Sequence, residues 1–136
     1  MASFPRHFLT IAVLATCGWS GSSAEVTSDD ASTTTVPLVR LLANPELYNG
    51  KRVTVTGYYR GGFEESSLYL TRDFSSVGDI SSSLWISLPD RSGQKFTNYK
   101  RGFVTVTGTF RGSSGARLGH AGGWDCAITD VSQFEA

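Results

Sequence analysis

The stretch Val-Thr-Val-Thr-Gly occurs twice, at residues 53–57 and 104–108, and both copies continue with an aromatic residue followed by Arg-Gly. Strict alternation of β-branched apolar and polar residues predicts a half-buried strand at each copy. A glycine directly after such a run usually marks a bulge or a sharp bend. The repeat therefore predicts two matching, strongly bent strands, with Gly57 and Gly108 as the bend points.

Around the repeat, the chain from Val36 onward has the pattern of one short helix followed by strands. Leucines at helical spacing in residues 38–48 predict the helix, with Thr35 as its N-cap and Pro37 in its first turn. The segment between the second and third strands, residues 74–83, is rich in serine and is expected to be a loop. The five strands are expected at residues 51–61, 67–72, 83–89, 102–112 and 124–134.

Five short antiparallel strands joined by long loops indicate a small barrel or sandwich. Closing five strands into a barrel requires strong curvature, which glycine supplies without a Cβ clash. In an OB-fold the first and fourth strands pair to close the barrel, and these are the two strands that carry the repeat. The predicted fold is mainly β: a five-stranded OB-fold-like barrel preceded by a short N-terminal α-helix, over residues 36–136.

Five motifs carry a family resemblance when they are taken in order. They are "LVRLLANPELYNGKRVTVTGYY", "FEESSLYLTRDF", "SSLWISL", "FVTVTGTF" and "LGHAGGWDCAITDVSQFE". Their order and spacing resemble a group of short bacterial proteins of unassigned function, similar in layout to exported bacterial OB-fold modules. The resemblance implies an OB-fold and brings no catalytic residues. The chain departs from that group in its signal-like N-terminus and in "HAGGWDC", so export and any site around Trp124 are particular to it.

The first 24 residues have the layout of a secretory signal peptide. Arg6 and His7 form a weakly positive start, and residues 8–15 form a short apolar run. That run is too short to cross a bilayer, which takes about 20 apolar residues. We therefore expect an exported protein, and a buried N-terminal helix is the alternative.

Two processing sites compete within this signal. "LATC", at residues 14–17, is similar to a bacterial lipobox and would make Cys17 a lipidated first residue, whereas "SSA" at residues 22–24 is a small-x-small cleavage site. Residues 25–35 are rich in Ser, Thr and Asp and are expected to form a flexible tether. The protein is thus expected to be periplasmic or a membrane-anchored lipoprotein, with membrane contact only through Cys17.

Composition and motifs argue against several functional classes. Twelve Lys and Arg residues balance twelve Asp and Glu residues, so the chain lacks the basic excess that nucleic-acid binders use. The sequence has no zinc-ligand spacing, nucleophile elbow, Walker loop or dinucleotide fingerprint. Glu64 and Glu65 are expected to be solvated loop residues, and Cys126 a small buried one. We therefore expect no enzymatic activity, no cofactor and no metal.

A binding face is the remaining functional feature. OB barrels bind ligands across their second and third strands and the loops beside them. Aromatic and cationic side chains there could stack on or pair with a ligand. Tyr58 and Tyr59 point to opposite faces, so one of them is expected to be buried. For Trp85, the alternative to a binding role is a position in the core. The candidate binding residues are Tyr58, Arg60, Tyr69, Arg72 and Trp85, with His120 and Trp124 from the loop before the fifth strand.

These features together predict a non-enzymatic, exported OB-fold-like binding module. Its partner is expected to be a protein or a small ligand in the cell envelope, and an inhibitor or immunity protein is one version of this function. The alternative is a single-stranded nucleic-acid-binding OB domain, because such barrels stack bases on strand aromatics. Export and a net charge of zero oppose that alternative.

Incorporation of labelled palmitate distinguishes the two processing sites. Label in the wild-type protein that is lost in Cys17→Ala would identify a lipoprotein anchored at Cys17. Absence of label from the wild type would exclude lipidation and favour cleavage after the "SSA" sequence.

Overall fold

The structure is a computed structural model that describes residues 32–89, 100–112 and 115–136. The predicted signal peptide, Cys17 and residues 25–31 of the predicted tether lie outside the described residues. No helix within the described ranges is long and apolar enough to cross a membrane. The elements are β1 (Thr34–Thr35), α1 (Leu38–Ala43), α2 (Pro45–Tyr48), β2 (Arg52–Gly61), β3 (Ser66–Tyr69), α3 (Arg72–Val77), η1 (Ile80–Ser82), β4 (Ser83–Ile86), β5 (Arg101–Arg111), η3 (His120–Gly122) and β6 (Ala127–Glu135).

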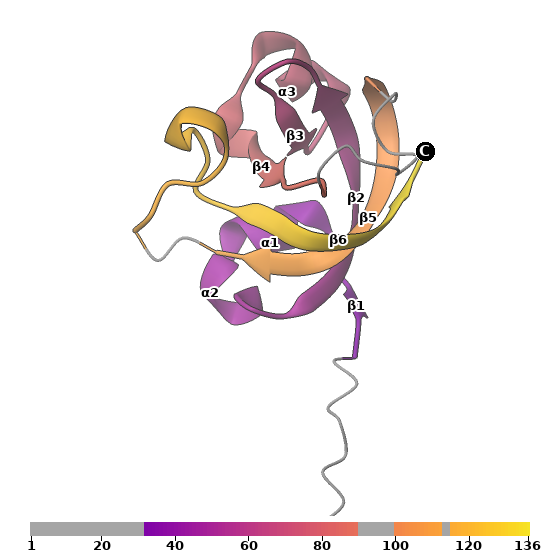
Figure 1. Cartoon of the computed structure of the whole chain (residues 1–136), viewed down its shortest axis with the longest axis vertical. Coiled ribbons are helices and arrows are strands. Elements are labelled where there is room, and N and C mark those ends of the chain that lie inside the picture. Colours follow the sequence, from indigo (N-terminus) through magenta and orange to yellow (C-terminus); the bar gives the residue numbers. More distant parts are fainter. Residues whose placement is uncertain (1–31, 90–99, 113–114) are drawn as a thin grey trace, which may run out of the picture.

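Five of the strands form a closed barrel in the order β2-β3-β4-β6-β5, with β5 pairing back to β2 (Figure 1). β4 and β6 run parallel, whereas the sequence predicted only antiparallel strands. The other neighbouring pairs of the barrel are antiparallel. Closure between the first and fourth barrel strands is the arrangement of an OB-fold. The prediction of a mainly β, five-stranded OB-fold-like barrel preceded by a short helix is confirmed.

The two copies of the repeat pair with each other in the β2–β5 ladder. They run antiparallel, so the pairing has a local two-fold arrangement in which each glycine lies opposite the first valine of the other copy. The valines of both copies point into the core, where they are almost completely buried. The register is Val53–Gly108, Thr54–Thr107, Val55–Val106, Thr56–Thr105 and Gly57–Val104.

The threonines of the repeat face away from the core and contact each other across the same ladder. The hydroxyls of Thr54 and Thr107 lie 2.8 Å apart, and those of Thr56 and Thr105 lie 2.9 Å apart. Cross-strand threonine pairs of this kind contribute about 0.2–1 kcal/mol each. Both faces of the repeat therefore stabilise the closing pair of strands.

Both glycines of the repeat are required by close approach. A Cβ on Gly57 would lie 2.7 Å from Leu68 Cγ and 2.9 Å from the backbone oxygen of Tyr69. A Cβ on Gly108 would lie 2.5 Å from Ile128 Cγ2. The β5–β6 register also shifts at Gly108, which marks the predicted irregularity there. The pairing at Gly57 continues without a shift, so the need for glycine there comes from packing.

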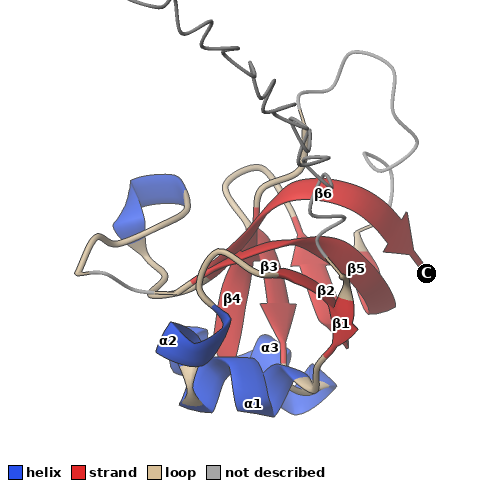
Figure 2. Cartoon of the chain, turned by 90° about the horizontal axis from the view of Figure 1, so that it is seen from below, coloured by secondary structure: helices blue, strands red, loops and turns tan. Residues whose placement is uncertain are grey.

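Helix α1 closes one end of the core. Leu38 and Leu41 are buried, and Leu38 lies against the position of Gly57. In Figure 2, α1 and α2 lie together below the strands. The buried residues that these leucines join include Val53, Val55, Leu68, Leu84, Ile86, Val104, Val106, Phe110 and Ile128, together with Cys126, whose expected burial is confirmed.

The start of the domain differs from the prediction. Thr35 does not cap α1, because the helix begins at Leu38 with Pro37 at the N-cap position and no side-chain cap. Thr34–Thr35 instead form β1, which pairs in parallel with β2. The ordered sheet therefore begins inside the segment that was expected to be a tether, because the backbone of Thr35 is held by strand pairing.

The loop predicted over residues 74–83 is mostly helical. The hydroxyl oxygen of Thr71 accepts a hydrogen bond of 3.3 Å from the backbone N–H of Phe74, which caps the start of α3. Gly78, with a φ of 69°, ends the helix in the left-handed conformation. These local caps define a helix of six residues, too short to show an apolar period in the sequence.

We predict that Gly57→Val lowers the free energy of unfolding by about 3 kcal/mol, since the added atoms would clash with a side chain and a backbone carbonyl that cannot both move. Urea unfolding monitored by circular dichroism would measure the loss. Gly62→Ala is the matched control, because a Cβ there would have no atom within 4 Å. An unchanged unfolding midpoint in Gly57→Val would contradict the close-approach explanation.

Candidate functional site

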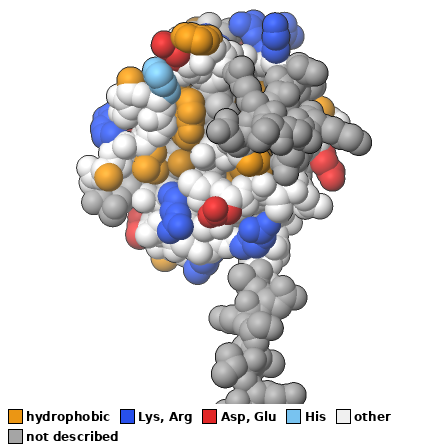
Figure 3. All heavy atoms as spheres, viewed as in Figure 1, with side chains coloured by type: hydrophobic (Ala, Val, Ile, Leu, Met, Phe, Trp, Pro, Cys, Tyr) orange, Lys and Arg blue, Asp and Glu red, His pale blue; other side chains and the backbone are white. Residues whose placement is uncertain are grey.

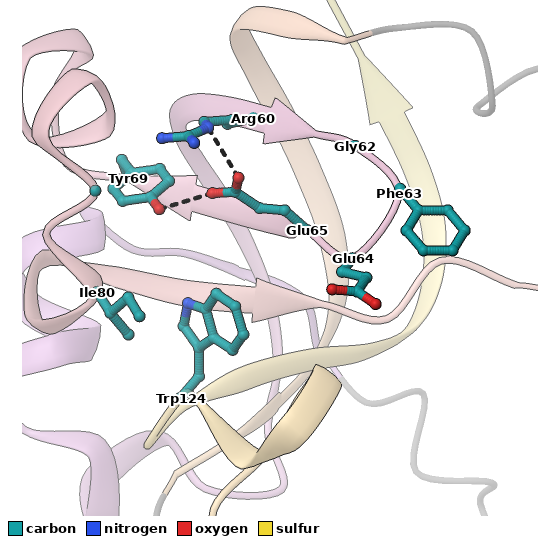
Figure 4. A pocket seen from close by; sticks show the side chains of 9 residues that line it. Arg60, Gly62, Phe63, Glu64, Glu65, Tyr69, Ile80 and Trp124 are labelled. Atoms are coloured by element: carbon teal, nitrogen blue, oxygen red, sulfur yellow. Dashed lines mark hydrogen bonds and ion pairs between the residues drawn. The ribbon is translucent and has the colours of Figure 1, made fainter.

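A hollow of about 430 Å³ lies between the β2–β3 loop, the start of η1 and the loop before β6 (Figure 4). Of the barrel strands, β2 contributes Arg60 and β3 contributes Tyr69 to its lining. In the space-filling view of Figure 3, hydrophobic side chains gather on the upper part of the face shown, beside a histidine and an acidic side chain. The lining residues are Arg60, Gly62, Phe63, Glu64, Glu65, Tyr69, Gly78, Ile80 and Trp124.

One wall of the hollow is a hydrogen-bonded network centred on Glu65. Its carboxylate accepts from Arg60 Nε at 2.8 Å and from the Tyr69 hydroxyl at 2.8 Å (Figure 4). Arg60 also donates from Nη1 to the backbone oxygen of Ser75, at 2.6 Å. The network therefore joins β2, β3, α3 and the β2–β3 loop into one support.

Tyr69 is the buried member of this network, with 1% of its surface exposed. Burial, together with the hydrogen bond and the negative charge of Glu65, raises the pKa of Tyr69 to about 12. The hydroxyl therefore keeps its proton at neutral pH and remains a donor to Glu65. Tyr69 acts as a neutral support beneath the carboxylate.

The opposite wall includes Trp124, which packs against Trp85 behind it. Trp124 is 7% exposed and donates from Nε1 to the Ser83 hydroxyl at 3.0 Å. Its ring lies 4.9 Å from that of Trp85, at an interplanar angle of 52°. A Cβ on Gly119 would lie 2.7 Å from both rings, and Gly119 has a φ of 77°. The loop before β6 can thus approach the tryptophans only because residue 119 is glycine.

Hydrogen bonds within the same loop close its base. Leu118 and Trp124 exchange two backbone hydrogen bonds, of 2.7 and 3.0 Å. Arg117 donates to the backbone oxygens of Gly122 and Gly123, at 2.8 and 2.9 Å. Between these anchors, η3 extends toward solvent and carries His120.

His120 links the two loops that border the hollow. Its Nε2 lies 3.5 Å from a carboxylate oxygen of Glu64, and both side chains are more than half exposed. Exposed pairs of this kind contribute little to stability. The contact is therefore weak and open to replacement by a cation from a ligand.

The rim of the hollow is apolar. Phe63, at the tip of the β2–β3 loop, is 95% exposed, and Ile80 is 42% exposed. Val77, next to the lining residue Gly78, is 77% exposed. Large apolar side chains gathered around a hollow are typical of an interaction site.

The predicted binding residues fall into three groups. Arg60, Tyr69 and Trp124 line the hollow. Trp85 packs behind Trp124. His120 lies at the edge of the hollow, where it contacts the lining residue Glu64. Neither Tyr58 nor Arg72 is among the lining residues.

Tyr58 and Arg72 lie elsewhere for local reasons. The Tyr58 ring contacts Phe103 edge to face, with centroids 5.4 Å apart. Tyr59 is the buried member of the tyrosine pair, as predicted. The strand expected to reach Arg72 ends at Tyr69, so Arg72 begins α3 as an exposed residue.

Sequence reasoning missed six lining residues: Gly62, Phe63, Glu64, Glu65, Gly78 and Ile80. The expectation that Glu65 is merely solvated is wrong, because the tight β2–β3 connection returns it beside Arg60. The sequence did carry a signal for this contact. Arg60 lies near the end of a strand, and Glu65 follows it in a short hairpin loop. Ile80 was missed because its segment was expected to be an irregular loop.

The described residues include no group of three or more His, Cys, Asp or Glu side chains that could hold a metal ion. The hollow therefore offers aromatic and apolar surface and the exposed Glu64 carboxylate. Its other charged residues, Arg60 and Glu65, pair with each other. These groups can hold a ligand by contact, charge and hydrogen bonding.

The raised pKa of Tyr69 predicts a loss of stability at alkaline pH. A tyrosine in the unfolded chain ionises near pH 10, whereas folded Tyr69 ionises near pH 12. Between these values the unfolded state binds fewer protons, so the free energy of unfolding falls as pH rises. The stabilisation is fully present below about pH 10 and is lost by about pH 12.

Tyr69→Phe should therefore lose less stability than the wild type between about pH 9 and pH 11, as measured by urea unfolding at both values. Tyr59, whose pKa is also raised by burial, is present in both proteins and cancels in the comparison. Parallel losses in the two proteins would show that Tyr69 is not the responsible group.

Comparison of the chain with protein-family models, curated proteins and solved structures gives no match. The resemblance to short bacterial OB-fold-like proteins therefore stays a prediction from the sequence, and function is inferred from the hollow and its surroundings.

Proposed function

We propose that this protein is a non-enzymatic, OB-fold-like binding module that holds a partner at the hollow between the β2–β3 loop and the loop before β6. The observation that carries the proposal is the position of the hollow. It is lined by Arg60 of β2 and Tyr69 of β3, the first and second strands of the barrel, and it lies between the two loops that border the usual binding face of this fold.

The rim favours a protein as the partner. Phe63 and Ile80, which line the hollow, are 95% and 42% exposed. A small molecule within the hollow would leave this apolar rim in water, whereas a protein surface would cover it. Aromatic side chains at the centre of an interface commonly carry much of its binding energy. An inhibitor or immunity role is one form that such binding takes.

The charges of the hollow argue against the nucleic-acid alternative. A phosphate backbone requires cations that are free to pair with it. Among the described residues, Arg60 is the cation that lines the hollow, and its guanidinium already contacts Glu65 and Ser75. Glu64 and Glu65 would also face any phosphate directly. Single-stranded nucleic acid is therefore disfavoured at this site.

The proposed location is the cell envelope, which rests on the signal-like N-terminus. The described chain begins next to β1, which lies toward the lower end of the molecule in Figure 1, whereas α3 and the β2–β3 hairpin lie toward the upper end. A tether that enters through β1 would join the domain at the end opposite to α3 and the β2–β3 hairpin. This arrangement suits a domain that presents its binding face outward.

Crosslinking in intact cells, followed by capture of the protein from the envelope fraction, tests the proposal. Phe63→Ser is expected to reduce the crosslinked partner about tenfold or more, since loss of an aromatic side chain that anchors an interface commonly costs at least about 1.4 kcal/mol. Leu47→Ser on α2 is the matched control, because Leu47 is also an exposed apolar residue, at 57%, and should retain the partner.

Equal capture by both variants would reject the hollow as the binding site. Retention of the purified protein on single-stranded DNA at low salt, with a steep loss as salt rises, would instead favour the nucleic-acid alternative.

A further inference from the structure

The charged residues that line the hollow are not equivalent. Arg60 and Glu65 pair with each other, and Tyr69 and Ser75 complete their hydrogen bonding. Glu64 stands apart from this network. Its side chain is 60% exposed, and its partner in the described part of the chain is His120 Nε2, at 3.5 Å. The hollow therefore carries one carboxylate that is available to a ligand.

The nearby acidic residue Asp79 is committed to local structure. Its carboxylate accepts from the backbone N–H of Ser81 and from the hydroxyl of Ser82, at 3.1 and 2.7 Å. It therefore caps η1 and still adds negative charge beside the lining residue Ile80. Among the charged residues that line the hollow, one negative charge, that of Glu64, remains once Arg60 is balanced by Glu65.

Apolar and aromatic surface lies next to the available carboxylate. In Figure 4 the Glu64 carboxylate lies between the Phe63 ring and the Trp124 indole, and Ile80 lies on the far side of that indole. A tryptophan face attracts a cation, and an alkyl stem packs well against aromatic and aliphatic side chains. The combination suits a cation at the end of an apolar stem.

We infer that the hollow receives a basic side chain, lysine or arginine, from a protein partner, an inference that rests on the proposed binding function. The stem packs against Trp124 and Ile80, and the charged end pairs with Glu64 in place of His120. An acidic side chain is disfavoured, because it would face Glu64 and Glu65, and the cation among the described lining residues, Arg60, is already paired. The exposed Phe63 supplies the apolar contact around this central group.

Peptide binding to the full chain, followed by NMR at the assigned indole Nε1–H of Trp124, tests the inference. The probes are three acetylated and amidated tripeptides, Gly-X-Gly, with lysine, norleucine or glutamate as X. The lysine peptide is expected to bind at least about 5-fold more tightly than the other two, in line with the strength of an exposed cation–π and carboxylate contact. Equal or tighter binding of the glutamate peptide, or no binding of the lysine peptide, would overturn the inference.

Two variants identify the carboxylate. Glu64→Gln is expected to remove the preference for lysine and to leave norleucine binding unchanged. Glu46→Gln makes the same change at an exposed residue of α2 and should keep the preference. A lysine preference that survives Glu64→Gln would show that Glu64 does not receive the cation.

A further probe separates a protein side chain from a free amine. If n-butylammonium binds as tightly as the lysine peptide, the ligand is a small amine and the assignment to a protein partner is wrong. The Phe63→Ser capture experiment reports independently on the binding function. A partner that depends on Phe63 combined with no lysine binding would leave the binding module in place and reject the basic side chain.

Discussion

Barrel closure depends on the pairing of β2 with β5, in which the two copies of Val-Thr-Val-Thr-Gly lie antiparallel to each other. The valines supply the core and the threonines form hydrogen-bonded pairs outside it. Each glycine opens the space that a neighbouring strand or helix fills. Without these two small residues Leu38, Leu68 and Ile128 could not pack as they do, because the Cβ positions overlap their side chains. The same pairing fixes where β2 ends, and thereby where the hollow begins.

The candidate site follows from this closure. Because β2 runs past its pairing with the second copy of the repeat, it carries Arg60 to the outer face, where β3 returns with Tyr69. The short connection between these strands brings Glu65 to both of them. On the other side, Gly119 allows the loop before β6 to lie against the tryptophan pair. Two loops from distant parts of the sequence therefore border one hollow.

The sequence predicted the features that depend on local alternation and failed where chain geometry decides. The barrel and its closing pair followed from the repeated strands and their glycines. Arg60, Tyr69 and Trp124 were identified because they lie on or beside strands of the binding face. The interaction of Arg60 was not predicted, because it depends on how the hairpin returns Glu65. The helix α3 was missed since its limits come from Thr71 and Gly78 rather than from an apolar period.

The near-identity of the repeated strands also bears on how the chain selects its own partner strand. The register that joins the first copy to the second within one molecule equally joins the first copy of one molecule to the first copy of another. During synthesis the first copy emerges about fifty residues before the second, and similar nascent chains nearby offer it the same pairing. Strand sequence alone therefore cannot distinguish intramolecular closure from exchange between molecules. Pairing within one molecule is instead favoured by chain connectivity, because the second copy, once synthesised, is held at a high local concentration near the first.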